Sequence, residues 1–309
     1  MRKKITIVGA GNVGAALMAW AAAKDLGNLV LVDVVDGLPQ GKALDLMAAA
    51  PLIRFDTKIV GTNDYRETAD SDVIVITAGM ARKPGMSRDD LLAANEEIMK
   101  SVVQEVTPLS PHAILIIVSN PLDAMCHVAK AVSGFPRERV IGMAGVLDSG
   151  RLRTFISWEL GVSVEDISAL VLGGHGDSMV PLIRYCSVGG VPLEQLISAD
   201  RIAALIERTR NAGAEVVSLL KTGSAFNSPG AAALQMIEAI IKDEKRIMPC
   251  AAYLQGEYGH SGIYLGVPVL LGIGGMERIF ELNLTYEEKL ALDKSAAAVK
   301  ELVVKLRYK

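Results

Sequence analysis

Hydrophobic residues in the first half of the chain form short, continuous runs that alternate with longer amphipathic stretches. Runs such as "LVLVD" and "AILIIVSN" are nearly continuous in apolar residues, which is typical of strands buried on both faces, and "KITIV" is short and β-branched. Right-handed crossovers between such strands predict a doubly wound parallel sheet with helices on both faces. We expect strands over 4–8, 29–33, 57–61, 72–79, 113–120 and 139–143, and helices over 12–24, 38–50, 88–106 and directly after Pro121.

The rhythm of the chain changes near residue 145. Helices are expected there over 147–160, 198–220, 229–242 and 286–306. The run "GIYLGVPVLLGIGG" indicates strands of an antiparallel region. We therefore predict an α/β domain over 1–145, followed by an α+β substrate or catalytic domain over 146–309.

Composition and charge narrow the class of protein. Of 309 residues, 50% are hydrophobic and 22% are charged, and the formal net charge of −3 comes without a basic stripe, which disfavours a nucleic-acid partner. The longest apolar runs are too short to span a membrane, and no secretory signal is recognisable. Three widely spaced cysteines favour a reducing, cytoplasmic compartment. One of them, Cys186, is expected to be an exposed but unreactive thiol, with an intersubunit disulfide as the less favoured alternative.

A glycine-rich turn follows the first expected strand. Residues 9–14 read "GAGNVG", with Gly9 suited to a tight turn, Gly11 to the close approach of a pyrophosphate, and Gly14 to helix–strand packing. The helix that starts here offers free N–H groups and a partial positive charge. We expect this turn to bind a dinucleotide in a Rossmann-type fold through Gly9, Gly11, Asn12, Val13 and Gly14. A turn without a ligand is the disfavoured alternative.

An acidic residue, Asp33, ends the second expected strand, 19 residues after Gly14. Its carboxylate would accept hydrogen bonds from a ribose diol and repel a 2′-phosphate, and the next residues, Val34 and Val35, carry no cation. This pattern favours NAD over NADP. The run "GLPQGKA" at 37–43 is not a P-loop, because three rather than four residues separate its glycines and Ala43 replaces the required Ser or Thr.

One of the four histidines has the surroundings of a general base. His175 lies in "GGHGDSMV" after the apolar run "SALVL", where small neighbours allow a substrate close to the imidazole. Its titration near neutral pH suits proton transfer during the oxidation of an alcohol. His112, His127 and His260 lack metal-ligand spacing and are expected to have structural or surface roles, so no metal site is predicted.

A histidine base needs a carboxylate partner that fixes its tautomer. Asp177 is two residues away, but an aspartate in a glycine turn is more often a turn former. Asp148, in "GVLDSGRLR", is the better candidate, and Arg151 on the same helical face could bind a carboxylate bidentately. From spacing alone, an i,i+3 surface ion pair remains the favoured explanation of Asp148 and Arg151.

Taken together, these segments resemble a known family. "GAGNVG", Asp33, "GMARKPGMSR", "VSNPLD", "GVLDSGR" and "GGHGDSMVP" occur in an order similar to the lactate/malate dehydrogenase family, and most of all to its lactate-dehydrogenase-like branch of malate-oxidising enzymes. The likeness runs from the first strand to the C-terminal helix. It implies NAD-dependent oxidation of (S)-malate to oxaloacetate by a homotetramer or dimer, and the helices at 38–50 and 229–242 are candidate interfaces.

The resemblance also implies a role for individual residues. His175 would accept and donate the proton, with Asp148 as its orienting partner. Arg151 would hold the α-carboxylate of the substrate, and Arg88 would polarise the reacting carbonyl. The remaining implied contacts are Asn95 near the cofactor, Val118 and Ser119 beside the nicotinamide, and Asn120 at both substrate and nicotinamide.

The residue expected to select the substrate is Arg82. Lactate-type members of the family typically carry glutamine there, and malate-type members carry arginine. An unpaired arginine in a closed pocket would reject pyruvate, at a cost of about 2–5 kcal/mol, whereas oxaloacetate supplies a second carboxylate. We expect the loop over 79–92 to close over the substrate and exclude water.

Two positions depart from the family pattern. Ala81 stands where proline is frequent, and Asn227 where related malate enzymes often have an aromatic residue. Both leave the fine substrate preference open. The nearest alternative function is a lactate or broader 2-hydroxyacid dehydrogenase, and a non-catalytic NAD-sensing module is the alternative from another class.

Overall fold

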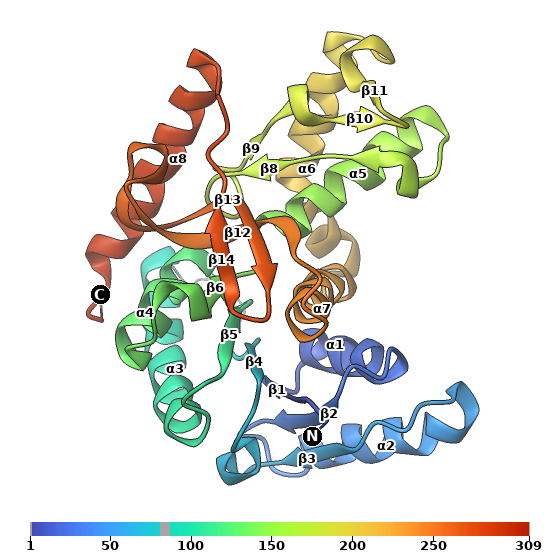
Figure 1. Cartoon of the computed structure of the whole chain (residues 1–309), viewed down its shortest axis with the longest axis vertical. Helices are drawn as coiled ribbons and strands as arrows, with labels where there is room; N and C mark the ends of the chain where they lie inside the picture. The colour runs from blue at the N-terminus through green and yellow to red at the C-terminus, as the bar shows by residue number, and fades with distance from the viewer. Residues whose placement is uncertain (1, 81–86, 309) are drawn as a thin grey trace.

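A nine-stranded sheet runs through the centre of the molecule (Figure 1). The computed structural model describes residues 2–80 and 87–308. The strands of this sheet are β1 (Lys4–Val8), β2 (Asn28–Val32), β3 (Ile59–Thr62), β4 (Val73–Ile76), β5 (Ile114–Ile117), β6 (Val140–Gly142), β12 (Arg246–Gln255), β13 (Ser261–Gly272) and β14 (Gly275–Ile279). Their spatial order is β14-β13-β12-β6-β5-β4-β1-β2-β3.

The first six strands form a parallel, doubly wound half-sheet. They lie in the order β3-β2-β1-β4-β5-β6, and every pair among them is parallel. All four residues of β4 and all four of β5 are buried, as expected for strands covered on both faces. The strand order reverses between β1 and β4, and such a switch point opens a crevice at the carboxyl ends of the strands. The Rossmann-type sheet predicted from the sequence is therefore confirmed.

In the described part of the chain, eight α-helices cover the sheet and extend beyond it. They are α1 (Asn12–Ala23), α2 (Leu38–Ile53), α3 (Arg88–Leu109), α4 (Leu122–Ser133), α5 (Gly145–Leu160), α6 (Ala199–Leu220), α7 (Asn227–Ile241) and α8 (Tyr286–Lys305). Each corresponds to a predicted helix, with ends that differ by a few residues. None of these described helices combines the length and the apolar character that a membrane crossing requires.

Helix α7 packs inside the chain, against α1. Nine of its residues are buried, among them Ala233, Met236 and Ile237. Its apolar face is thus covered within one copy, and a subunit interface through the helix at 229–242 remains a prediction. The other candidate, α2, keeps exposed apolar side chains, including Leu44 and Leu52.

The antiparallel strands of the C-terminal half continue the same sheet rather than forming a separate one. Strand β12 was not predicted, because Pro249 and a run of small residues hide its strand pattern. It pairs antiparallel with β6, where Ala251 lies opposite Gly142. A Cβ added to Gly142 would lie 2.8 Å from the Cβ of Ala251, so this junction needs glycine. The division at residue 145 remains a prediction from the sequence.

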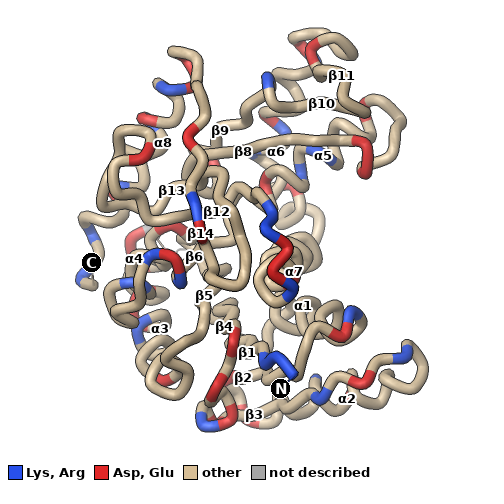
Figure 2. Tube along the Cα trace, viewed as in Figure 1, with Lys and Arg blue, Asp and Glu red and all other residues tan. Residues whose placement is uncertain are grey.

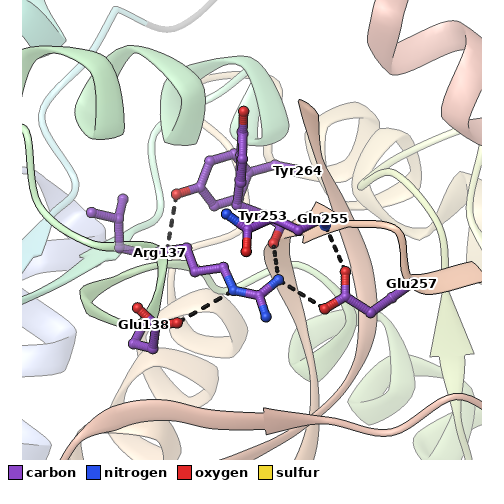
Figure 3. Close-up of polar contacts among 7 residues, drawn as sticks. Arg137, Glu138, Tyr253, Gln255, Glu257 and Tyr264 are labelled. Carbon is purple, nitrogen blue, oxygen red and sulfur yellow. Dashed lines mark hydrogen bonds and ion pairs between the residues drawn. The ribbon is translucent and has the colours of Figure 1, made fainter. Parts of the chain in front are cut away.

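Polar contacts reinforce the junction between β6 and β12 (Figure 3). Arg137, just before β6, donates a hydrogen bond from Nη1 to Glu257 Oε1 at 2.8 Å and to the Tyr253 carbonyl at 3.2 Å. Tyr264 on β13 donates from its hydroxyl to the carbonyl of Val140 at 3.2 Å. These contacts tie the parallel half-sheet to the hairpin that extends it.

A second, smaller core lies between α5 and α6, away from the sheet (Figure 1). Leu152 and Ile156 from α5 pack there with Ile202 and Leu205 from α6. Short strands flank this core: β7 (Ile167–Ser168), β8 (Val171–Leu172), β9 (Val180–Pro181), β10 (Ser187–Val188) and β11 (Val191–Pro192). Single 3₁₀ turns complete the fold: η1 (Tyr65–Thr68), η2 (Arg137–Arg139), η3 (Val164–Asp166), η4 (Ile183–Tyr185), η5 (Leu193–Gln195) and η6 (Glu257–Gly259).

The segment after β8 connects the two cores. Gly173 forms an isolated bridge with Gly266 of β13, so this segment is bonded to the central sheet. It leads directly to His175. Figure 2 shows basic and acidic residues interspersed along the described trace, without a long run of one sign.

Candidate active site

The three glycines of the turn after β1 have different steric surroundings. A Cβ on Gly9, whose φ is +107°, would lie 2.6 Å from Thr77 Oγ1, and one on Gly14 would lie 1.9 Å from the Gly9 carbonyl oxygen. A Cβ on Gly11 would meet nothing within 4 Å. The first and third glycines are therefore required by packing within the protein, whereas the second faces open space.

Helix α1 begins at this open space. It starts at Asn12, and its N-cap residue Gly11 has no side chain that could accept hydrogen bonds from the first turn. The N–H groups at Asn12 and Val13 thus lie at the positive end of the helix without a side-chain cap. Open space over Gly11 and uncapped donors beside it fit the pyrophosphate of NAD.

The carboxylate of Asp33 is held beside the glycine turn. Its Oδ2 accepts a hydrogen bond from the Ala10 N–H at 2.6 Å, and its Oδ1 accepts one from the Val35 N–H at 2.9 Å. Lys42 of α2 reaches the same turn and donates to the Ala10 carbonyl at 2.6 Å. Sequence analysis missed this lysine as part of the turn, because the rejected P-loop pattern around it gave no reason to bring it there.

Asn95 of α3 joins the segments that follow β4 and β5. Its Oδ1 accepts from the Met80 N–H at 2.7 Å, and its Nδ2 donates to the carbonyls of Met80, at 3.1 Å, and Asn120, at 2.7 Å. Ser119 donates from its hydroxyl to the Ala78 carbonyl, and Val118 is buried. Asn120 itself is exposed at the carboxyl end of the sheet. Asn95 thus holds the segments after β4 and β5 together at the carboxyl end of the sheet.

The imidazole of His175 meets Asp148 across 27 residues of sequence. His175 Nδ1 lies 2.9 Å from Asp148 Oδ2, and the Asp148 side chain is only 2% exposed. Arg151 Nη1 lies 3.7 Å from Asp148 Oδ1, with its own side chain 14% exposed. The Asp148–Arg151 pair is therefore not a surface ion pair, and the explanation that spacing alone favoured is wrong. The carboxylate of Asp148 accepts a hydrogen bond from the Nδ1–H of His175. In the neutral ring, the free lone pair is therefore on Nε2.

Opposing effects act on the protonation of this site. Burial alone lowers the pKa of His175, but the charge and hydrogen bond of Asp148, with the charge of Asp123, outweigh it and raise that pKa above its usual value. Burial also lowers the pKa of Arg151, which the charge of Asp148 partly offsets. A guanidinium titrates far above neutral pH, so Arg151 keeps its charge.

Sequence analysis also missed Asp123, which touches the same loop. Its Oδ2 accepts a hydrogen bond from the backbone N–H of His175 at 2.9 Å, and the residue is 5% exposed. Burial, as the largest effect, raises the pKa of this carboxyl to about 6. The available signal was an acidic residue in the first turn of the helix after "VSNP".

Of the two loop arginines, Arg82 and Arg88, only Arg88 lies within the described residues. Arg82 and the rest of the stretch 81–86 of the expected closing loop lie outside the described residues. Arg88 is the first residue of α3, which starts with a capping box between Ser87 and Asp90.

Two other groups named from the sequence, His127 and Cys186, have buried surroundings of their own. His127 is buried and accepts the Tyr264 N–H at Nε2, at 3.0 Å, and burial lowers its pKa to about 4, so its structural role is confirmed. Cys186 is 1% exposed within the second core, and burial raises the pKa of its thiol to about 11. The expectation of an exposed Cys186 is wrong, because the preceding turn directs it inward. Within residues 2–80 and 87–308, no group of three His, Cys, Asp or Glu residues could hold a metal ion.

Nicotinamide-dependent dehydrogenases as a class combine two features that this chain has. One is a glycine turn suited to a dinucleotide at the switch point of the sheet, and the other is a histidine–carboxylate pair. The family model described as the lactate/malate dehydrogenase NAD binding domain matches residues 3–142. The model described as the lactate/malate dehydrogenase alpha/beta C-terminal domain matches residues 145–306. The chain belongs to the lactate/malate dehydrogenase family, as its sequence resemblance implied.

Individual relatives match over nearly the full length. A malate dehydrogenase of Desulforudis audaxviator is 62% identical over 299 residues, which covers 97% of each chain. The solved malate dehydrogenase of Salinibacter ruber has a TM-score of 0.95 at 52% identity, over 98% of this chain and 97% of that one. A Cryptosporidium parvum lactate dehydrogenase complexed with lactic acid and NAD has a TM-score of 0.95 at 43% identity, over 98% of both chains.

Proposed function

We propose that this chain catalyses the reversible oxidation of (S)-malate to oxaloacetate with NAD as the hydride acceptor. The observation that carries the proposal is the 2.9 Å contact between His175 Nδ1 and the buried carboxylate of Asp148, with Arg151 beside them. The full-length relatives named malate dehydrogenase support the choice of substrate.

Proton transfer falls to His175. When NAD is bound, it supplies the acceptor for the hydride that leaves the alcohol carbon. His175 Nε2 accepts the hydroxyl proton as that hydride departs, and returns it to the carbonyl oxygen in the reverse reaction. Asp148 holds the ring through Nδ1 and stabilises the imidazolium. Its side chain is 2% exposed, so solvent screens this charge interaction little.

Substrate binding falls to the arginines. Arg151 contacts Asp148 at 3.7 Å, longer than a hydrogen bond, so this contact leaves its planar fork able to bind the α-carboxylate bidentately. Arg88, at the start of α3, is proposed to polarise the reacting carbonyl. Arg82 is proposed to pair with the second carboxylate, and Asn120, at the carboxyl end of the sheet, to contact substrate and nicotinamide.

The cofactor contacts are proposed for the residues of the switch-point crevice. The uncapped start of α1 and the open space over Gly11 support pyrophosphate binding there. The anchored carboxylate of Asp33 supports recognition of the adenosine ribose. The proposed cofactor-binding residues are Gly9, Gly11, Asn12, Val13, Gly14, Asp33, Asn95, Val118, Ser119 and Asn120.

Lactate oxidation is the second candidate function. The Cryptosporidium lactate dehydrogenase resembles this chain in fold as closely as the Salinibacter malate dehydrogenase does, so the fold does not separate the two substrates. Arg82 separates them by charge, because pyruvate brings no second carboxylate to pair with it.

The test is a panel of 2-oxoacids with NADH and NADPH. We expect the wild-type chain to reduce oxaloacetate with NADH far faster than pyruvate or 2-ketoisocaproate. Arg82→Gln should lose about 10²-fold or more in kcat/KM for oxaloacetate and gain measurable pyruvate reduction, with Arg82→Lys as the charge-retaining control. Unchanged oxaloacetate turnover in Arg82→Gln would show that this arginine does not select the substrate.

Assembly and location are proposed together with the activity. The exposed Leu44, Leu52 and Ile53 on α2 support self-association through that helix, and we propose a homotetramer, with a dimer as the alternative outcome. Free thiols at all three cysteines support a cytoplasmic location. Sedimentation of the wild type against a Leu44→Glu, Leu52→Glu variant tests the interface.

A further inference from the structure

We propose that Asp123 is a positioning residue for the proton transfer, which fixes the backbone of His175 and places a second negative charge beside the imidazolium. The inference rests on the proposed role of His175 as the general base. Asp123 acts through His175 and has no proposed contact with the substrate.

The geometry shows how the loop that carries His175 is held. The backbone N–H of His175 donates to Asp123 Oδ2 at 2.9 Å, and the N–H of Gly174 donates to Ser295 Oγ at 2.8 Å. A Cβ on Gly174 would lie 2.9 Å from Val299 Cγ2 and 3.3 Å from Asp123 Oδ2. Helix α4 therefore anchors the loop through Asp123, and helix α8 anchors it through Ser295.

Asp123 differs from Ser295 because it brings a charge to a dry site. It is 5% exposed, and its Oδ1 is buried without a hydrogen-bond partner among the described residues. Leaving such an oxygen unpaired destabilises the folded chain, because its desolvation is not compensated. A neutral acceptor would hold the same N–H at lower cost, so anchoring alone does not account for a carboxylate here.

The charged groups around the imidazole divide by sign. Asp148 and Asp123 raise the pKa of His175, against the lowering effects of burial and of Arg151. For Asp123 itself, burial and the charge of Asp148 raise the pKa, and the N–H and charge of His175 oppose them. Cys126, one turn further along α4, adds a neutral thiol, because burial raises its pKa well above the usual value. Protonation of His175 therefore favours ionisation of Asp123, so the two groups titrate as a linked pair.

The decisive variant is Asp123→Asn, which retains an oxygen acceptor for the His175 N–H and removes the charge. Oxaloacetate reduction needs protonated His175, so its kcat/KM falls as pH rises through the pKa of that residue. In Asp123→Asn this fall should move to lower pH by about one unit, with the Kd for NADH unchanged.

The matched control is Ser295→Ala, which removes the other anchor of the loop without changing charge. It should lower kcat modestly and leave the pH of the fall unchanged. A merely structural role for Asp123 predicts the same behaviour in both variants. If the pH at which kcat/KM for oxaloacetate reduction falls is unchanged in Asp123→Asn, the proposal is overturned.

A second readout needs no turnover. NMR titration of the four histidines in the cofactor-free chain, with the His175 signal assigned by its loss in His175→Gln, should show the His175 midpoint shifted down by about one unit in Asp123→Asn. The wild-type His175 signal should also show a second inflection near the titration of Asp123. A single-step wild-type titration would overturn the proposal even if Asp123→Asn fails to fold.

The two readouts separate this inference from the proposed function. If the wild-type chain does not reduce oxaloacetate with NADH, the proposed function fails, and the NMR titration still decides whether Asp123 acts on His175. If the wild type is active and the His175 midpoint does not depend on Asp123, only the further inference fails.

Discussion

The glycine turn at 9–14 and the centre around His175 are built in opposite ways. The turn is one contiguous segment, and its proposed contacts with the cofactor come from backbone atoms and from the absence of side chains. The centre is made of side chains from three elements that are far apart in the sequence: Asp123 on α4, Asp148 on α5 and His175 after β8.

The two regions therefore differ in how a substitution acts on them. In the turn, a substitution acts mainly through the space that it fills. At the centre, a substitution acts through charge and proton affinity, because the groups are buried and hydrogen-bonded. Variants at the two regions should therefore separate binding from chemistry.

The largest effect is expected for His175→Asn. Loss of the base should reduce kcat by about 10²–10⁴-fold, while the Kd for NADH changes little because the turn is intact. Steady-state kinetics and fluorescence titration of NADH measure the two quantities. A large loss of NADH affinity would indicate that His175 is structural.

His127 provides the matched control, since it is also buried but lies against Tyr264. His127→Gln retains an acceptor for the Tyr264 N–H, so kcat should stay close to that of the wild type. The folded-state pKa of His127 is about 4, below the ordinary value of 6.5, so it contributes stability above pH 6.5 that is lost as pH falls toward 4. The thermal stability of His127→Gln should fall less between pH 7 and pH 4.5 than that of the wild type.

Asp148→Asn should alter both the rate and its pH dependence. The variant removes the charge that raises the pKa of His175, so the fall of oxaloacetate reduction with rising pH should move down by about 1–3 units. The malate oxidation profile should move in the same direction, because it needs the neutral ring. We also expect kcat to fall by about 10²-fold, and an unshifted profile would exclude Asp148 as the partner.

The glycine turn is tested by a pair of alanine variants. Gly14→Ala puts a Cβ 1.9 Å from the Gly9 carbonyl oxygen and should cost about 1–3 kcal/mol of unfolding free energy, measured by urea denaturation. Gly11→Ala meets no protein atom within 4 Å, so its stability should be unchanged while NADH binds about 10-fold more weakly. Equal NADH affinity in Gly11→Ala and wild type would place the pyrophosphate elsewhere.

The smallest effect is expected at Asp33. Asp33→Ser removes the charge proposed to repel a 2′-phosphate, and Lys42 remains beside the turn. The preference for NADH over NADPH, as a ratio of kcat/KM values, should fall by about 10-fold. Lys42→Met in the same background should restore part of the preference for NADH. If neither variant changes that preference, residues outside this turn determine it.

Much of the fold follows from local pattern. Buried strands such as "VIVI" and "ILII" have no polar face, so they require a sheet covered on both sides, and the helices between them set its parallel order. Strand β12 was missed because its pairing depends on Ala251 packing on Gly142, a contact between residues more than a hundred positions apart. The strand propensity of a local segment does not indicate such a distant partner.

For the candidate site, the sequence alone determined the shape of the glycine turn, because a glycine motif brings its own geometry and the groups proposed to bind the nucleotide are backbone atoms. It also identified His175, Asp148 and Arg151 as residue types suited to the chemistry. Only the tertiary structure decided that Asp148 faces His175, that Asp123 holds the same loop and that Lys42 reaches the glycine turn. The physical reason is that charge interactions depend on distance and burial in space, and only the packing of α2, α4 and α5 determines these.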